Sequence, residues 1–185
     1  MNHLLRNITN IFSQITKVIF VITVALAPIN SSFAKEKSYY ELQSEIVYNF
    51  IEYVSWGQTS FETNKVKNLC IMEDNPVIPY LHNLLESKNE KHIMVIRKHE
   101  NDYLEDCHIL FVNDNYDGYL SRLLARVKGK PVLTFGNVKN FAESGGIVQF
   151  RLRNNRVEFI VNTKEMRSSQ VRISDFILSV SETVN

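Results

Sequence analysis

The stretch GGIVQFRLRNNRVEFIVN, residues 145–162, has the most regular pattern in the chain. Apolar residues alternate with mostly polar or charged residues on both sides of Asn154-Asn155. A period of two predicts strands with one apolar and one polar face, which is typical of antiparallel pairs. Asparagine tolerates the positive φ angles of a two-residue turn, so we interpret the stretch as a β-hairpin.

Three residues at the ends of this hairpin are expected to have structural roles. Gly145 and Gly146 should end a short helix over 138–144, because a glycine can adopt the left-handed conformation that closes a helix. The same two glycines allow a sharp passage from helix to strand. Asn162 is expected to cap a short helical segment after the hairpin, with its side chain accepting a backbone N–H.

Upstream of the hairpin, helices and strands alternate. A capping box at Ser38–Glu41 starts a helix with a wide apolar stripe. The strands predicted before the hairpin start near Val66, His92, Cys107 and Lys130, with helical patterns after the first and third. A last helix is expected from Ser174. This order predicts a single three-layer α/β domain, with a mixed sheet of about six strands flanked by helices and a C-terminal antiparallel hairpin.

Residues 1–34 have the composition of a secretory signal peptide. Two basic residues are the only charges before Lys35, and they precede an apolar run over 18–27. Ser32 and Ala34 then offer small side chains at the positions that a signal peptidase reads. A membrane-spanning helix needs about 20 apolar residues, twice the length of this run. We therefore expect cleavage near Ala34.

Cleavage would leave one exported domain over 35–185. Removing 34 of the 185 residues leaves 151, which suits one domain with a proper core. Two of the 21 basic residues leave with the signal peptide, so 19 basic and 20 acidic residues give a net charge of −1. This balance does not favour nucleic acid or an anionic membrane as a partner. We expect a soluble exported protein.

Two cysteines, Cys70 and Cys107, remain in the exported part. Outside the cytosol, an even pair predicts a disulfide. Each cysteine lies in or at the start of an apolar strand, so the bridge is expected between neighbouring strands. The bridge would close a loop of 38 residues, counted inclusively. In the chain-entropy model, a bridge across such a loop contributes roughly 4 kcal/mol to stability. Its role is expected to be mainly structural, with redox sensing as the alternative.

The residues suggest no catalytic chemistry. The sequence has no GxGxxG, phosphate-loop, HExxH or GxSxG motif, and its histidines lack metal-ligand spacing. We interpret His108 beside Cys107 as a strand histidine next to a disulfide cysteine, in preference to a Cys–His catalytic pair. We therefore expect a protein that is not an enzyme and that uses no cofactor and no metal.

Five segments in order, spanning about residues 40–180, resemble the YfiR family of bacterial periplasmic regulators. The segments are YNFIEYVSW (48–56), LCIMEDNP (69–76), CHILFVN (107–113), PVLTFGNVKNFAESGGIVQF (131–150) and RVEFIVN (156–162). Each motif alone is weak. Their order, their spacing and the preceding signal peptide together make the resemblance specific.

The resemblance implies a function by binding. Members of this family bind the periplasmic sensor domain of an inner-membrane diguanylate cyclase and hold the enzyme inactive, which represses cyclic di-GMP synthesis and biofilm formation. Redox stress, or capture by an outer-membrane OmpA-like lipoprotein, relieves the inhibition. The resemblance leaves a homodimer open. The alternative function is a periplasmic small-ligand-binding or sensing module, because α/β sheets often offer a ligand crevice at their strand ends.

The partner-binding surface is expected near the hairpin and the last helix, at Phe150, Glu158, Ile160 and Phe176. Ile160 lies on the otherwise charged face of its strand, so it is either covered by a neighbouring element or offered to a partner. Phe150 falls on the inner face by the same alternation. An interface of this kind rests on a few apolar anchors ringed by polar residues.

Overall fold

The structure is a computed structural model that describes residues 37–56, 66–116, 118–153 and 156–185. The expected signal peptide at 1–34 and the expected hairpin turn at Asn154-Asn155 lie outside these residues. None of the helices in the described part of the chain is long and apolar enough to cross a bilayer.

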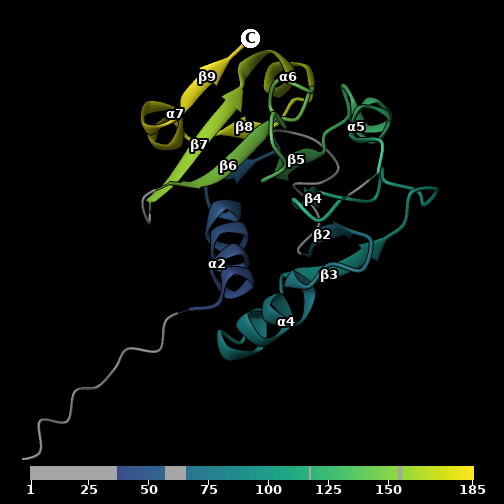
Figure 1. The fold of residues 1–185 in the computed structure, drawn as a ribbon, viewed down its shortest axis with the longest axis vertical. Helices are drawn as coiled ribbons and strands as arrows, with labels where there is room; N and C mark the ends of the chain where they lie inside the picture. The colour runs from purple at the N-terminus through teal and green to yellow at the C-terminus, as the bar shows by residue number, and fades with distance from the viewer. Residues whose placement is uncertain (1–36, 57–65, 117, 154–155) are drawn as a thin grey trace, which may run out of the picture. The chain divides into compact units, whose positions relative to one another are not determined.

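The described residues include a main sheet of seven strands in the order β3-β2-β4-β5-β6-β7-β9 (Figure 1). Its members are β2 (Lys67–Met72), β3 (Ile93–Lys98), β4 (Ile109–Val112), β5 (Leu133–Gly136), β6 (Val148–Arg153), β7 (Arg156–Asn162) and β9 (Glu182–Val184). Strands from β3 to β6 pair in parallel, β6 and β7 pair antiparallel, and β9 lies parallel to β7. The predicted mixed sheet and its hairpin are therefore confirmed.

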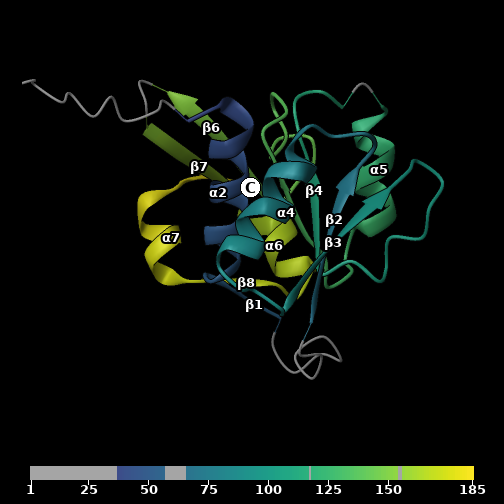
Figure 2. The same cartoon turned by 90° about the horizontal axis from the view of Figure 1, so that it is seen from below.

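Helices cover both faces of this sheet, which confirms the predicted α/β class. Figure 2 shows α4 and α5 on opposite sides of β2 and β4. The helices are α2 (Tyr39–Ile51), α4 (Val77–Ser87), α5 (Leu120–Val127), α6 (Thr163–Ser168) and α7 (Asp175–Val180). One apolar cluster joins α2, α4 and α7 to the sheet, and another joins α5 to its other face.

The capping box predicted at the start of α2 forms in the structure. The Ser38 hydroxyl accepts from the Glu41 N–H at 3.2 Å, and the Glu41 carboxylate accepts from the Ser38 N–H at 3.4 Å. Along the buried stripe of the helix, the ring of Phe50 lies 4.7 Å from Phe135 and 5.1 Å from Phe159. These contacts fix α2 across β5 and the hairpin.

The hairpin pairs in the register that its alternation predicts. Phe150 lies opposite Phe159, Leu152 opposite Val157, and Val148 opposite Val161. Most of these apolar side chains pack into the cluster that holds α2 and α7. Burial of one face therefore sets the register, because a shift by one residue would turn the apolar side chains to the other face.

Three local predictions differ from the structure. The expected helix over 138–144 is a series of turns, because Asn140 has φ of +57° and interrupts helical geometry. The sequence does not predict β9, the edge strand that pairs with β7, since three residues are too few to show a period. A small second sheet, in which β1 (Val54–Ser55) pairs antiparallel with β8 (Arg172–Ile173), was missed for the same reason.

Candidate functional site

An apolar groove lies between the end of α2, the outer part of β7 and α7. Its volume is about 290 Å³. The lining residues are Ile46, Asn49, Phe50, Tyr53, Val157, Phe159, Phe176, Ile177 and Val180. We call this cavity the α2–α7 groove. It lies where the hairpin and the last helix meet, which is the region predicted to bind a partner.

Large apolar side chains in the groove are open to solvent. Phe176 is 62% exposed and Val180 61%, while Tyr53 and Val157 are exposed to a smaller extent. The rings of Tyr53 and Phe176 lie 5.8 Å apart and tilt toward each other by 30°. Buried side chains, among them Phe50, form the floor. Contiguous exposed apolar side chains of this kind are typical of a surface that another molecule covers.

Backbone bonds hold the walls of the groove in place. The N–H of Ser174 donates to the carbonyl of Tyr53 at 2.9 Å, and Val54 pairs with Ile173 in the small second sheet. The hydroxyl of Ser174 then caps α7 by accepting from the Ile177 N–H at 3.4 Å. Backbone hydrogen bonds therefore join the start of α7 to the end of α2. The groove is already formed, so a partner need not order it on binding.

A shallow depression with charged residues adjoins the groove. It is lined by residues 52–55 and 172–175 and has a volume of about 350 Å³. Glu52, Arg172 and Asp175 are exposed in this depression. An apolar centre with a charged rim matches the anatomy of protein–protein interfaces.

The structure corrects two of the four residues predicted at the partner-binding surface. Phe150 is 1% exposed and stacks on Phe135 with ring centroids 5.1 Å apart. Ile160 is 3% exposed, because it lies in register between Gln149 of β6 and Glu182 of β9. The apolar residue whose exposure the alternation left open is therefore buried, with paired strands on both sides. Neither side chain is accessible to a partner in this conformation.

Glu158 and Phe176 have different surroundings. Phe176 lies in the α2–α7 groove. Glu158 alternates with Val157 and Phe159, both of which line the groove, so its side chain extends from the other face of β7. There its carboxylate accepts from Arg151 Nε at 2.6 Å, and this bond does most to raise the pKa of Arg151. Sequence reasoning missed Tyr53, Val157 and Val180 as groove residues.

A disulfide joins Cys70 in β2 to Cys107, which precedes β4, with a Cα–Cα distance of 5.7 Å. Both cysteines are fully buried. The neighbouring carboxylate of Asp106 pairs with Lys98 at 2.9 Å. Cys70, Cys107 and Asp106 are close enough for a metal site, but both sulfur atoms are committed to the disulfide.

His108 behaves as a structural residue beside this disulfide. Its Nδ1 accepts from the backbone N–H of Asn68 at 3.0 Å. Burial is the main cause that lowers the pKa of His108, and the positive charge of Lys67 lowers it further. A neutral ring that accepts a backbone hydrogen bond agrees with the interpretation of a strand histidine.

The strand ends, where a small-ligand module would place its ligand, carry a network of direct side-chain bonds. The hydroxyl of Tyr39 donates to Asp114 Oδ2 at 2.6 Å and accepts from Asn137 Nδ2 at 2.9 Å. Burial, followed by the bond to Asp114, raises the pKa of Tyr39 to about 12. The phenol therefore keeps its proton at neutral pH and ties the start of α2 to the ends of β4 and β5.

The residues predicted to shape the hairpin ends lie in one small region. Gly145 has φ of +103°, a conformation that favours glycine. A Cβ on Gly146 would lie 2.2 Å from ring atoms of Phe141, so that position requires the absence of a side chain. Asn162 is buried and caps α6, because its Oδ1 accepts from the Glu165 N–H at 3.0 Å. Its Nδ2 also donates to the Ala142 carbonyl at 2.8 Å.

Replacing Asn162 by alanine is expected to lower the free energy of unfolding by about 2 kcal/mol. The cap is worth about 1 kcal/mol, and the lost hydrogen bond from Asn162 Nδ2 to the Ala142 carbonyl costs a similar amount, although that carbonyl keeps its bond from the Gly145 N–H at 3.2 Å. Urea unfolding checks this value. Ser174→Ala, which removes only the longer cap of α7, is the matched control and should cost less. Equal losses in the two variants would contradict the double role of Asn162.

The chain matches a known protein family in sequence and a solved structure in fold. A family model described as YfiR/HmsC-like matches residues 40–182. None of the curated proteins matches the chain. A crystal structure of a conserved domain protein from Vibrio cholerae O1 biovar El Tor is similar in fold, with a TM-score of 0.54 and 11% sequence identity. The alignment covers 80% of this chain and 60% of that protein, so the chain spans less than two thirds of its length.

Proposed function

Because the chain belongs to the YfiR/HmsC-like family, we propose that it represses a membrane diguanylate cyclase by binding the enzyme's periplasmic sensor domain. The family suggests a periplasmic regulator of diguanylate cyclase signalling, and its YfiR-like members are regulators, not enzymes. In the proposed action, the bound protein keeps the cyclase inactive, and cyclic di-GMP synthesis and biofilm formation fall. Export with a signal peptide cleaved near Ala34 is part of the same proposal.

The observation that carries this proposal is the α2–α7 groove. Its exposed aromatic pair, Tyr53 and Phe176, can receive an apolar anchor from the sensor domain. Aromatic residues are enriched among the residues that dominate binding energy at interfaces. The rim carries both acidic and basic side chains, at Glu52, Arg172 and Asp175. It therefore favours a partner whose surface has charged residues of both signs around the apolar anchor.

Binding to one conformation of the sensor domain is sufficient for this mechanism. A sensor domain that docks only in its inactive conformation would be held there by the binding free energy, since a ligand shifts an equilibrium by its differential affinity for the two states. Such repression requires no chemistry at the groove. Capture by an OmpA-like lipoprotein would release the cyclase if the lipoprotein covered the same side chains. A homodimer through the groove would compete with both partners in the same way.

The test is direct binding between purified proteins. Residues 35–185 are titrated into the periplasmic segment of each membrane diguanylate cyclase from the same organism, and heat release is measured. We expect one of these segments to bind with a dissociation constant in about the micromolar range or tighter, given a preformed apolar site. If no such segment binds, the cyclase proposal is wrong.

A further inference from the structure

Another cavity, of about 260 Å³, lies beside α5, on the face of the sheet opposite the α2–α7 groove. Two segments that follow β3 and β4 meet one face of the helix there. The lining residues are Glu100, Asn101, Tyr116, Tyr119, Arg122, Leu123 and Arg126. We call it the α5 cavity. It belongs to none of the surfaces used in the proposed function.

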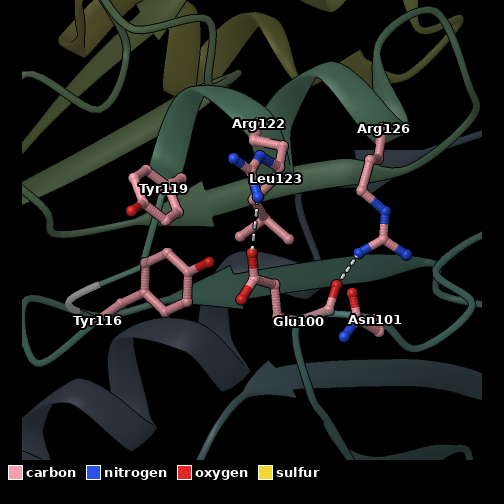
Figure 3. Close-up of a pocket in the computed structure, with 7 residues that line it drawn as sticks. All are labelled: Glu100, Asn101, Tyr116, Tyr119, Arg122, Leu123 and Arg126. Atoms are coloured by element: carbon pink, nitrogen blue, oxygen red, sulfur yellow. Dashed lines mark hydrogen bonds and ion pairs between the residues drawn. The ribbon is translucent and has the colours of Figure 1, made fainter.

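The α5 cavity has two chemically different ends. Figure 3 shows the rings of Tyr116 and Tyr119 at one end and Arg126 with Asn101 at the other. Leu123, which is buried, lies between them. Spacings of three and four residues place the helical members on one face of α5. A ligand that fills the cavity therefore meets an aromatic end and a polar, cationic end.

The residues that line the cavity carry more positive than negative charge. Arg126 donates through Nη1 and Nη2 to the backbone carbonyls of Glu100 and Asp102, which hold the guanidinium in place without a carboxylate. Arg122 Nη1 meets Glu100 Oε1 at 3.3 Å, longer than the roughly 2.7–2.9 Å of a strong charge-assisted bond. Two guanidinium groups thus face one carboxylate among the lining residues. Glu73, which lies nearby, is paired with His99.

Two tyrosine rings, those of Tyr116 and Tyr119, line the aromatic end. The guanidinium of Arg122 lies 4.6 Å from the ring centre of Tyr119. The ring of Tyr116 occupies the space that a side chain at Gly118 would need, because a Cβ there would lie 2.2 Å from ring atoms. Burial is the main cause that raises the pKa of Tyr116, so its hydroxyl remains a hydrogen-bond donor at neutral pH. A flat aromatic ring packs favourably against the rings of tyrosine side chains.

We propose that the α5 cavity binds a small carboxylate that carries a flat aromatic ring. The carboxylate takes the place of the Glu100 side chain against Arg122, near the fixed charge of Arg126. The ring lies against Tyr116, Tyr119 and Leu123. A single negative charge balances the excess of one guanidinium, whereas a dianion such as a phosphate monoester would leave a charge unmatched. This inference does not depend on the cyclase proposal.

Benzoate is the probe for this site, titrated into ¹⁵N-labelled residues 35–185 and followed by amide chemical shifts. We expect saturable shifts at Tyr119, Leu123 and Arg126. Arg122→Ala should weaken binding about tenfold, because a charged hydrogen-bonded pair is lost. Glu100→Gln should tighten binding several-fold, because the competing carboxylate is removed. Arg153→Ala, which removes an exposed arginine from the hairpin, should change nothing.

A gain of affinity in Glu100→Gln cannot result from misfolding, so this variant decides the matter even if Arg122→Ala unfolds. Acetate and benzyl alcohol separate the two halves of the ligand, and both should bind more weakly than benzoate. The proposal is overturned if Glu100→Gln binds benzoate no better than the wild type. It is also overturned if the shifts gather around Phe176 in the α2–α7 groove, or if benzyl alcohol binds as well as benzoate.

Discussion

Replacing Phe176 by aspartate is expected to weaken binding to the cyclase sensor domain by about 100-fold or more. Phe176 is the most exposed aromatic side chain of the α2–α7 groove and contacts Tyr53 across it. Truncating an aromatic hot spot costs 2 kcal/mol or more, and a carboxylate buried without a partner adds to this cost. Calorimetric titration of wild type and variant against the same segment measures the ratio.

The structure offers a matched control for this variant. Tyr103 is 66% exposed and lies outside the groove, so Tyr103→Asp adds the same charge at a similarly exposed aromatic position. Both variants should melt within a few degrees of wild type, because surface substitutions seldom change stability strongly. Equal affinity of Phe176→Asp and Tyr103→Asp would show that the groove is not the binding surface.

The second large effect concerns the disulfide. Replacing Cys70 and Cys107 together by alanine is expected to lower the free energy of unfolding by about 4 kcal/mol, because the open chain regains the entropy that the cross-link removes. This loss is a large share of the 5–15 kcal/mol that typically stabilises a domain. Urea unfolding of the oxidised wild type and the double variant measures the difference.

The same experiment separates a structural disulfide from a redox switch. Both cysteines belong to the apolar cluster on the α5 face, whereas the α2–α7 groove is built on the other face. We therefore expect the double variant, at a temperature where it remains folded, to bind the sensor domain as the wild type does. Unchanged stability would refute the structural role. Weaker binding by a folded variant would support redox sensing instead.

The parts of the fold that the sequence predicts are those with a long local period. The alternation from Val148 to Val161 gives the hairpin and its register, and the stripe through Phe50 gives α2 with its capping box. Asn162 could be recognised as a cap from its place between strand and helix. In each case a single face is buried, and the periodicity of the sequence reports that face directly.

The site depends on contacts between distant segments, which one sequence does not reveal. Tyr53 enters the groove because its carbonyl accepts from Ser174, and no local pattern joins these positions. Ile160 is buried in the interior of the sheet, where β9, only three residues long, pairs with its strand β7. Arg126 would normally be taken as part of the solvated side of α5, yet two carbonyls after β3 hold it over a cavity. Tertiary placement decides all three.

The central claim is tested most directly by measuring cyclic di-GMP in the strain that encodes this protein. Deleting the gene should raise the cellular concentration, and expressing the wild type or Tyr103→Asp should restore it. Phe176→Asp, expressed to the same level in the periplasm, should not restore it. Cyclic di-GMP that stays unchanged after deletion, under several growth conditions and with the cyclase present, would contradict the proposal that this protein represses the enzyme.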